Sequence, residues 1–187
     1  MASVVWFTGL SGAGKSTIAR ATEAALLEQG IPVEVLDGDA IRKTFSRGLG
    51  FSKQDRDENV RRVGFVAALL ARHGVTVLVA LISPYRALRD EVREQMESAA
   101  IPFLEVYVNA PLNICVGRDP KGLYGKAQRG EIPSFTGLGD PYEPPLAPEV
   151  ECHTDQETVE SSTRRVLEAL QYAPRAIKTA ATVRAKM

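Results

Sequence analysis

Short apolar runs, rich in Val, Ile and Leu, recur along the chain and are separated by longer stretches with the amphipathic spacing of helices. The runs read SVVWFTG, PVEVLDGD, TVLVALIS and FLEVYVNA, and a shorter one, EVECHT, lies near the C-terminus. Strand-sized runs that alternate with helices are typical of a parallel sheet covered by helices on both faces. The pattern therefore predicts a three-layer α/β/α fold with a central parallel sheet of about five strands.

The stretches between the runs carry signals for helix ends. KSTIARATEAALLEQG and DRDENVRRVGFVAALLARHG both finish in glycine, which often follows a helix C-terminus. A third helix, in PYRALRDEVREQMESA, is expected to have Ser83 as its N-cap and Pro84 in its first turn. A last helix is predicted from about residue 156 to residue 171.

The chain changes character between residues 111 and 148, where Gly, Pro and charged residues predominate. Such a segment resembles a mobile lid more than a core element, and we expect the lid at about residues 118–145. Residues 1–172 are expected to form a single domain, because a chain of 187 residues suits one core. Residues 173–187, APRAIKTAATVRAKM, are expected to form a flexible tail.

The charge composition gives no global field, since the chain has 23 basic and 23 acidic residues. Nucleic acid and anionic membranes are therefore not expected as partners, and any anion recognition must be local. No Arg-rich leader and no apolar span of about 18 residues is present, so we expect a soluble, cytoplasmic protein. Cys115 and Cys152 fit reduced thiols better than a disulfide framework or a zinc site. A regulatory disulfide between them is the less favoured alternative.

A glycine-rich motif follows the first apolar run. GLSGAGKS, residues 9–16, has the G-x-x-x-x-G-K-[ST] pattern and lies between a strand and a helix, the context that this motif requires. Backbone N–H groups of such a loop surround a β-phosphate, Lys15 neutralises β- and γ-oxygens, and the Ser16 hydroxyl can bind Mg²⁺. The alternative, a plain strand-to-helix turn, has no use for the Lys-Ser ending. The residues expected to bind ATP are Gly9, Ser11, Gly12, Ala13, Gly14, Lys15, Ser16 and Thr17.

The motif predicts a bound nucleoside triphosphate but not the reaction. A GTPase would carry the guanine-reading N-K-x-D, which this chain lacks. A motor ATPase usually has a larger body and an apolar strand that ends in Asp, whereas the third strand here ends in Ser83. The small size and the lid favour a kinase that shuts a small acceptor away from water.

Two carboxylates follow the second apolar run, in LDGDAIR. Asp37, Asp39 and Arg42 should reach the carboxyl end of the sheet, where open α/β folds bind ligands. One carboxylate, Asp37, can organise Mg²⁺ together with Ser16, and Asp39 can accept the proton of an attacking hydroxyl. Alternatively, Asp39 only caps the helix AIRKTF.

The segment GFSKQDRDENVRRVG, residues 50–64, begins a helix with Ser52 as N-cap and Asp55 at the third helical position. The next position is Arg56, so Phe51 has no apolar staple partner and its ring is free to pack on a ligand base. Arg56 and Asn59 extend the buried stripe of this helix. A cation at the end of a buried stripe needs a partner, and a bound anion would serve.

Arg61 and Arg62 of the same helix follow Asp57 and Glu58 by four residues. This is the spacing of exposed ion pairs worth about 0.3 to 0.5 kcal/mol, so we interpret these residues as a solvated face.

Two further residues carry candidate chemistry. The Ser83 hydroxyl could touch the acceptor or transiently carry phosphate, if it is not merely the N-cap described above. Lys121, in DPKGLY, could swing onto the reacting phosphates as the lid closes, if it is not simply an exposed lysine.

Six motifs occur in the same order as in one known family: GLSGAGKST, LDGD-x-x-R, GFS-x-x-DR-x-EN-x-RRVG, ISPYR, RDPKGLY and FTG-x-x-DPYEPP. On these motifs the chain resembles the adenylylsulfate kinase (APS kinase) family from Val4 to Leu170. The resemblance implies a P-loop kinase that uses ATP and Mg²⁺ to phosphorylate the ribose 3′-hydroxyl of adenosine 5′-phosphosulfate (APS). The products would be 3′-phosphoadenosine 5′-phosphosulfate (PAPS) and ADP, in sulfate assimilation. It also implies a homodimer and a functional link to an ATP sulfurylase.

The resemblance also assigns residues. The implied APS contacts are Asp39, Arg42, Phe51, Arg56, Asn59, Ile82, Ser83, Lys121 and Phe135. The implied neighbours of the ATP adenine are Arg118, Cys152 and Thr154. The residues to which we assign catalytic roles are Lys15, Asp39, Ser83 and Lys121. Ser83 matches the position that the family labels a phosphoserine intermediate, although transfer directly in line from ATP needs no covalent stop. Gly139 departs from the family, which often has Asp there, and its effect should be confined to the lid.

Two other functions stay open. One is a kinase of the same scaffold that acts on a nucleoside or a sugar acid, which the set Phe51, Arg56 and Asn59 disfavours. The other is a nucleotide-binding regulatory module without turnover, which the presence of Lys15, Ser16, Asp37 and Asp39 disfavours.

Overall fold

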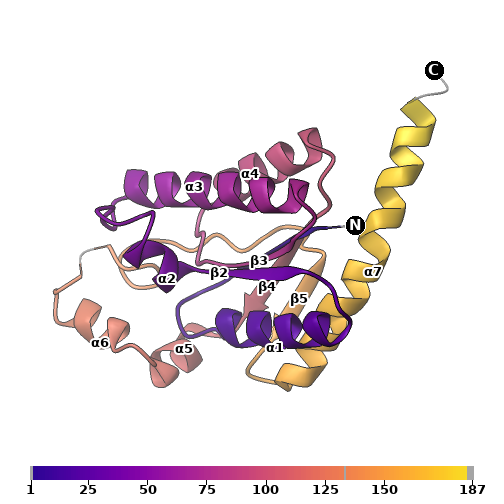
Figure 1. The fold of residues 1–187 in the computed structure, drawn as a ribbon. Helices are drawn as coiled ribbons and strands as arrows, with labels where there is room; N and C mark the ends of the chain where they lie inside the picture. Colours follow the sequence, from indigo (N-terminus) through magenta and orange to yellow (C-terminus); the bar gives the residue numbers. More distant parts are fainter. Residues whose placement is uncertain (1, 133, 185–187) are drawn as a thin grey trace.

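The computed structural model describes residues 2–132 and 134–184, with side chains as far as residue 171. A parallel five-stranded sheet lies at its centre, in the order β2-β3-β1-β4-β5 (Figure 1). The strands are β1 Val4–Thr8, β2 Val33–Asp37, β3 Thr76–Ala80, β4 Phe103–Asn109 and β5 Val150–His153. Each apolar run of the sequence is one of these strands, so the predicted parallel sheet is confirmed.

Helices cover both faces of the sheet, as Figure 1 shows, with α3 and α4 on one side and α1 on the other. The helices are α1 Lys15–Glu28, α2 Gly38–Lys43, α3 Lys53–Arg72, α4 Arg86–Ser98, α5 Leu112–Arg118, α6 Leu123–Gln128 and α7 Val159–Arg184. The three-layer α/β/α prediction is therefore confirmed. The short helices α2, α5 and α6 gather at the end of the sheet where the glycine-rich loop connects β1 to α1.

The central strand β1 contributes to two separate cores. All five of its residues are buried. Val5 and Phe7 belong to the apolar cluster under α1 and α7, whereas Val4 and Trp6 belong to the cluster under α3 and α4. Alternate residues of a strand point to opposite faces, so a strand covered on both sides is apolar at nearly every position. The polar exception in β1 is Thr8, whose buried hydroxyl donates to the Ile82 carbonyl oxygen at 2.8 Å.

The start of α4 differs from the prediction. Its N-cap is Tyr85, and the first helical residue is Arg86, so the expectation that Ser83 caps the helix with Pro84 in its first turn is wrong. Ser83 instead has a left-handed backbone with a φ of 38°. Its hydroxyl accepts a hydrogen bond from Trp6 Nε1 at 3.0 Å, which directs the side chain toward the sheet.

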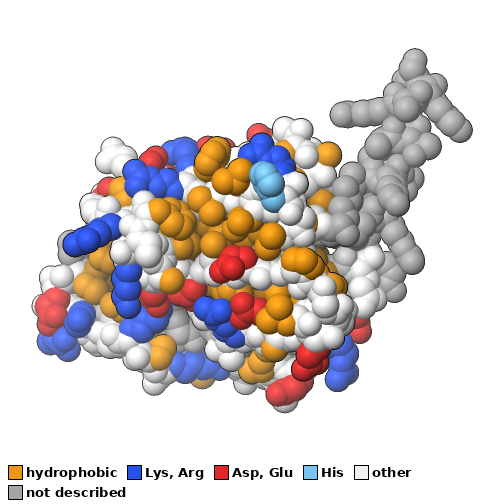
Figure 2. Space-filling model, in the orientation of Figure 1, with side chains coloured by type: hydrophobic (Ala, Val, Ile, Leu, Met, Phe, Trp, Pro, Cys, Tyr) orange, Lys and Arg blue, Asp and Glu red, His pale blue; other side chains and the backbone are white. Residues whose placement is uncertain are grey.

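The last helix is longer than predicted. It begins at Val159 and continues to Arg184, past the expected end at residue 171. That residues 173–187 are flexible stays a prediction, and residues 185–187 lie outside the described part. Among the helices of residues 2–132 and 134–184, none is long and apolar enough to cross a membrane. Figure 2 shows basic and acidic side chains interspersed on the face in view, in agreement with the balanced composition.

Candidate active site

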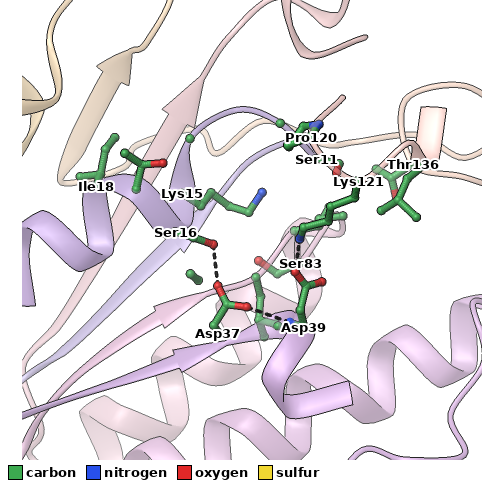
Figure 3. A pocket seen from close by; sticks show the side chains of 18 of the residues that line it. Ser11, Lys15, Ser16, Ile18, Asp37, Asp39, Ser83, Pro120, Lys121 and Thr136 are labelled. Carbon is green, nitrogen blue, oxygen red and sulfur yellow. Dashed lines mark hydrogen bonds and ion pairs between the residues drawn. The ribbon is translucent and has the colours of Figure 1, made fainter. Parts of the chain in front are cut away.

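A cavity of about 630 Å³ lies at the carboxyl ends of the central strands. It extends from the glycine-rich loop, past β2 and the start of α3, to the segment after α5 (Figure 3). The predicted site residues that line it are Ser11, Gly12, Gly14, Lys15, Ser16, Thr17, Asp37, Asp39, Arg42, Phe51, Arg56, Asn59, Ile82, Ser83, Arg118, Lys121, Phe135 and Thr154. The structure therefore brings both the expected ATP contacts and the expected acceptor contacts to one cavity.

Three predicted residues do not line this cavity. Ala13 and Cys152 have no exposed surface, and Cys152 lies in the core under α1 and α7. Gly9 lies where the loop leaves β1 and passes against β4. A Cβ at this position would come within 2.3 Å of the Val108 carbonyl oxygen, so only glycine fits. Gly9 and Ala13 are thus residues of the glycine-rich loop that do not line the cavity.

Lys15 lies in the curl of the loop. Its ammonium donates hydrogen bonds to the carbonyl oxygens of Gly9 at 2.9 Å and Leu10 at 2.7 Å. Burial, reinforced by the nearby charge of Lys121, lowers the pKa of Lys15 to about 8. The ammonium is therefore held by carbonyl oxygens in a buried setting that disfavours its charge unless an anion is near.

Ser16 and Asp37 form a corner next to Lys15, visible in Figure 3. The Ser16 hydroxyl donates to Asp37 Oδ2 at 2.5 Å, and Asp37 Oδ1 accepts from the N–H of Asp39 at 3.0 Å. Burial raises the pKa of Asp37, but these hydrogen bonds and the charge of Lys121 outweigh it, so the pKa lies below its ordinary value. Asp37 is thus the N-cap of α2, and the alternative in which Asp39 caps this helix is wrong.

Asp39 and Lys121 form an ion pair across the mouth of the cavity, between α2 and the lid. Both side chains keep about half of their surface exposed, at 51% and 45%. The pair is therefore positioned to meet a ligand rather than to stabilise the fold, because exposed pairs contribute little to stability.

The start of α3 has the predicted cap. The Ser52 hydroxyl accepts from the N–H of Asp55 at 3.1 Å and donates to its carboxylate at 2.7 Å. Phe51 remains 45% exposed at the cavity, with the guanidinium of Arg42 placed 4.7 Å from its ring centre. An aromatic face and a cation at one end of the cavity suit a planar, anionic ligand.

Arg56 is buried, as the helical pattern predicted, but its partners come from the chain itself. It donates to the backbone oxygens of Phe51 and Ser134 and to the Thr136 hydroxyl, and its Nη1 lies 3.4 Å from Asp140 Oδ2. A bound anion is therefore not required to satisfy this cation. The sequence pattern missed Asp140 and Thr136 because both lie about eighty residues further along the chain.

Asn59 lies one helical turn beyond Arg56 and is 5% exposed. In the described residues its Oδ1 atom has no hydrogen-bond partner. A buried amide oxygen that lines a cavity and lacks a partner favours a ligand with an N–H donor.

The lid segment packs directly on the glycine-rich loop. The Tyr124 hydroxyl donates to the Ser11 carbonyl oxygen at 3.0 Å, and the Phe135 ring meets the Tyr124 ring edge-on at 5.0 Å.

Arg118 donates to the carbonyl oxygens of Gly12, at 3.3 Å, and Thr154, at 2.6 Å. A side chain at Gly139 would meet Ser134 only at ordinary contact distances, the nearest being 3.5 Å.

Some lining residues were not predicted. Among them are Thr136 in the lid and Glu157, Thr158, Val159 and Ser162 around the start of α7. The others are Ile18, Gly38, Val60, Ala80, Leu81, Pro84, Pro120 and Leu123. Thr136 follows Phe135 in the quoted FTG motif, which gave a signal for it. The residues around the start of α7 have no local pattern, since only the fold brings this helix next to the loop.

Ser83 lines the cavity, but its hydroxyl is hydrogen-bonded inside the protein. The residue is 3% exposed, and its Oγ accepts from Trp6 and donates to Thr8 Oγ1 at 3.1 Å. Both capacities of the hydroxyl are thus used inside the protein.

The solvated side of α3 was predicted in part. Arg62 pairs with Glu58 at 2.7 Å, as the spacing indicated. Arg61 pairs instead with Glu91 of α4 at 2.7 Å, and Asp57 pairs with Lys53 at 3.0 Å. The predicted pair of Arg61 with Asp57 is wrong because a second helix lies alongside.

Cys115 and Cys152 are free thiols, and both are buried. The expected reduced state agrees with this finding. Burial raises the pKa of both thiols, so neither is activated as a nucleophile.

Comparison with known proteins agrees with the geometry. A family model described as adenylylsulphate kinase matches residues 1–153. An adenylyl-sulfate kinase of Microcystis aeruginosa is 61% identical over 162 residues, which is 87% of each chain. One of Myxococcus xanthus is 58% identical over 168 residues, or 90% of each chain. The structure of the Mycobacterium tuberculosis APS kinase in complex with AMPPNP and APS is 45% identical with a TM-score of 0.88, over 91% of this chain and 98% of that one.

A phosphate loop at the carboxyl end of the central strand of a doubly covered parallel sheet, with a lid packed on it, defines a P-loop kinase. A gluconokinase from Sinorhizobium meliloti, 19% identical with a TM-score of 0.61 over 95% of this chain and 97% of its own, shares this fold alone. The family model and the close relatives specify the kinase further: the chain belongs to the adenylylsulfate kinase family.

Proposed function

We propose that this chain transfers the γ-phosphoryl group of ATP to the ribose 3′-hydroxyl of APS, giving PAPS and ADP. The observation that carries the proposal is that one cavity extends from the phosphate loop to Phe51, Arg56 and Asn59. The loop suits the donor phosphates, and the second group suits an acceptor with an aromatic base and an anion. Membership of the family and the names of the close relatives support the same reaction.

The charged residues at the mouth of the cavity have complementary roles. A bond forms between the 3′-oxygen and the γ-phosphorus, the bond from that phosphorus to the β-bridging oxygen breaks, and Asp39 accepts the hydroxyl proton. Lys15 neutralises the phosphate oxygens from within the glycine-rich loop. Lys121 pairs with Asp39 and reaches the same space from the lid. The lid excludes water that would otherwise compete as acceptor.

Mg²⁺ fits the corner made by Ser16 and Asp37. The hydroxyl and the carboxylate are 2.5 Å apart, and the lowered pKa of Asp37 keeps it ionised at neutral pH. No group of three or more His, Cys, Asp or Glu that could hold a metal occurs in residues 2–132 and 134–184, so phosphates and water would supply the remaining ligands. When bound, the cation would offset the charge on the transferring phosphates.

Asn59 and Phe51 are proposed to read the acceptor's base. The unpartnered Asn59 Oδ1 suits an exocyclic amine, and the exposed Phe51 ring suits the face of a purine. Arg42, which is stacked over Phe51, and Arg56 are proposed to bind the sulfate and phosphate groups.

We further propose a homodimer that works in the cytoplasm on the product of an ATP sulfurylase. A hexameric APS kinase from Thiobacillus denitrificans, 36% identical with a TM-score of 0.69, supports an oligomer. The match covers 92% of this chain but 29% of that one. Light scattering coupled to size-exclusion chromatography measures the oligomeric state directly.

The function is tested by incubation with ATP, Mg²⁺ and APS, followed by chromatography of the nucleotides. We expect stoichiometric formation of PAPS and ADP, and no phosphorylation of gluconate or adenosine under the same conditions. Release of ADP that does not depend on APS would contradict the proposal.

Replacement of Ser83 by Ala is expected to retain transfer, with kcat within about tenfold of the wild type. The Ser83 hydroxyl is already bonded to Trp6 and Thr8, and transfer in line needs no covalent carrier. The measurement is steady-state PAPS formation together with mass spectrometry of protein incubated with ATP alone. A phosphoserine that forms and decays as fast as turnover would refute this expectation.

Nucleotide affinity is expected to fall as the pH rises above 8, because Lys15 must be charged to bind phosphate. Its lowered pKa, about 8, means that free protein loses this proton above pH 8 and must regain it on binding. The dissociation constant of ATP should then rise by up to about tenfold per pH unit, the slope of one linked proton. Titration calorimetry at pH 7 to 9.5, in buffers of different ionisation enthalpy, measures both the constant and the proton uptake. Equal affinity across this range would show that Lys15 is not linked to binding.

A further inference from the structure

Arg89 of α4 is a cation inside the protein, away from the phosphate loop. Its side chain is 1% exposed, and the residue is among the largest of the fully buried side chains. Each of the three nitrogens of a buried guanidinium needs a hydrogen-bond acceptor. The acceptors show which segments of the chain the guanidinium joins.

The three edges of the fork bond to three different parts of the chain. Nε donates to Glu105 Oε1 of β4 at 2.6 Å. Nη1 donates to the carbonyl oxygen of Ser83 at 2.6 Å, and Nη2 donates to the carbonyl oxygen of Glu143 at 2.7 Å. Only the first of these contacts pairs the charge, so the other two serve to fix backbone.

The first backbone segment is the acceptor side of the cavity. Ile82 and Ser83 line it, and Ser83 adopts a φ of 38°, which a residue with a side chain rarely adopts. Such a conformation persists only where its surroundings hold it. Arg89 and Trp6 hold it by hydrogen bonds to the Ser83 carbonyl oxygen and hydroxyl, and Thr8 Oγ1 bonds to the same two groups.

The second backbone segment is residues 140–143, which we call the return strap because it is the part of the lid that leads the chain back toward β5. The N–H of Glu143 donates to the Pro84 carbonyl oxygen at 2.9 Å, and the Tyr142 hydroxyl lies 3.0 Å from Thr8 Oγ1. Asp140 of the strap bonds to Tyr85 at 2.7 Å and pairs with Arg56. The strap therefore links the loop after β3 to the acceptor end of α3.

We infer that Arg89 is a positioning residue for the acceptor: its fork fixes the Ser83 backbone and the return strap, and through the strap the orientation of Arg56. Arg89 does not line the cavity, so it acts through these segments and not on the substrate. The inference rests on the proposed function, because the acceptor end is identified by that proposal. It predicts a defect in the use of APS with normal use of ATP.

The matched pair of variants is Arg89→Lys and Arg93→Lys. Both residues lie on α4 and contact Glu105, and Arg93 Nη2 is 3.6 Å from it. The other carboxylate partner of Arg93 is Glu149 at 2.6 Å, and within the described residues Arg93 makes no hydrogen bond to Ser83 or to the strap. Lysine keeps the charge at each position but loses the fork, so only Arg89→Lys should release the two carbonyl groups.

We expect Arg89→Lys to raise the KM for APS about tenfold and leave the KM for ATP within about twofold, since small displacements of positioned groups have large kinetic effects. Arg93→Lys should change neither constant by more than about twofold. The chain has one tryptophan, Trp6, so its fluorescence reports on the Ser83 contact. The emission maximum should move in Arg89→Lys and stay in place in Arg93→Lys, with far-UV circular dichroism unchanged in both.

Equal APS constants in the two lysine variants, or a joint rise of the APS and ATP constants in Arg89→Lys, would overturn the inference. If Arg89→Lys does not fold, Glu105→Gln decides the matter, because it loosens the fork while leaving Arg89 in place. A selective rise of the APS constant by about threefold in that variant supports the inference, and an unchanged constant overturns it. Wild-type protein that makes no PAPS would instead contradict the proposed function, so the two failures are distinguishable.

Discussion

Replacement of Lys15 by Met is expected to lower kcat by about 10² to 10³ while the protein stays folded. Lys15 is buried in the curl of the phosphate loop, where a charge acts in a medium of low dielectric and is worth far more than in water. Methionine fills the same volume without the charge. Burial lowers the pKa of Lys15, so the folded protein disfavours its own cation at neutral pH. The thermal midpoint should therefore stay the same or rise, the opposite of the change in activity.

The measurements are PAPS formation, ATP binding by calorimetry and thermal unfolding without ligand. Lys43→Met is the matched control, because Lys43 is exposed and does not line the cavity. It should leave kcat within about twofold and the thermal midpoint unchanged. A Lys15→Met protein that is as unstable as it is inactive would mean that the residue acts on the fold rather than on the phosphates.

The fold was largely predictable from the sequence because the covered parallel sheet imposes a strong pattern. A strand buried on both faces must be mostly apolar, as β1 is at every position except Thr8, and the helices between strands must be amphipathic. Gly30 and Gly74, with φ of 70° and 88°, follow α1 and α3 as the glycine signal indicated. These features depend on residues close together in sequence.

The local rules failed where a distant residue competes for the same group. Ser83 followed by Pro84 has the form of a helix start, but Trp6 and Arg89 bind the hydroxyl and carbonyl of Ser83 and hold its backbone left-handed. The N-cap of α4 is therefore Tyr85. The same reason applies to Arg61, whose partner is on a neighbouring helix and not four residues away.

The sequence predicted most residues of the candidate site, but not the contacts between them. Motifs and helical spacing named most of the residues that line the cavity, because the motifs after β1, β2 and β3 lie at the carboxyl ends of strands and the buried stripe of α3 ends at the cavity. They gave no information on the pairing of Lys121 with Asp39 or of Arg56 with Asp140. Both pairs join the body of the kinase to the lid, and no periodicity in the sequence encodes contacts between them.

Replacement of Arg56 by Ala is expected to raise the KM for APS by about 30-fold or more, because truncation of one partner of a buried charge pair costs about 2 kcal/mol or more. The change removes a cation that contacts the cavity and leaves Asp140, whose side chain is 19% exposed, without its cation. The Thr136 hydroxyl and the Ser134 carbonyl group lose a donor at the same time. Because Lys15 and Ser16 are untouched, ATP binding should change by less than about threefold.

Arg61→Ala is the control for this experiment, since Arg61 lies on the same helix and pairs with Glu91 while both side chains are 50% exposed. Loss of an exposed pair costs at most about 1 kcal/mol of stability and touches no ligand, so the APS constant should stay within about twofold. Arg56→Lys should fall between the two, because it keeps the charge but cannot bond to the helix, the lid and Asp140 together. Equal effects of Arg56→Ala and Arg61→Ala on the APS constant would show that the buried stripe of α3 does not reach the acceptor, and that the lid holds Arg56 for structure alone.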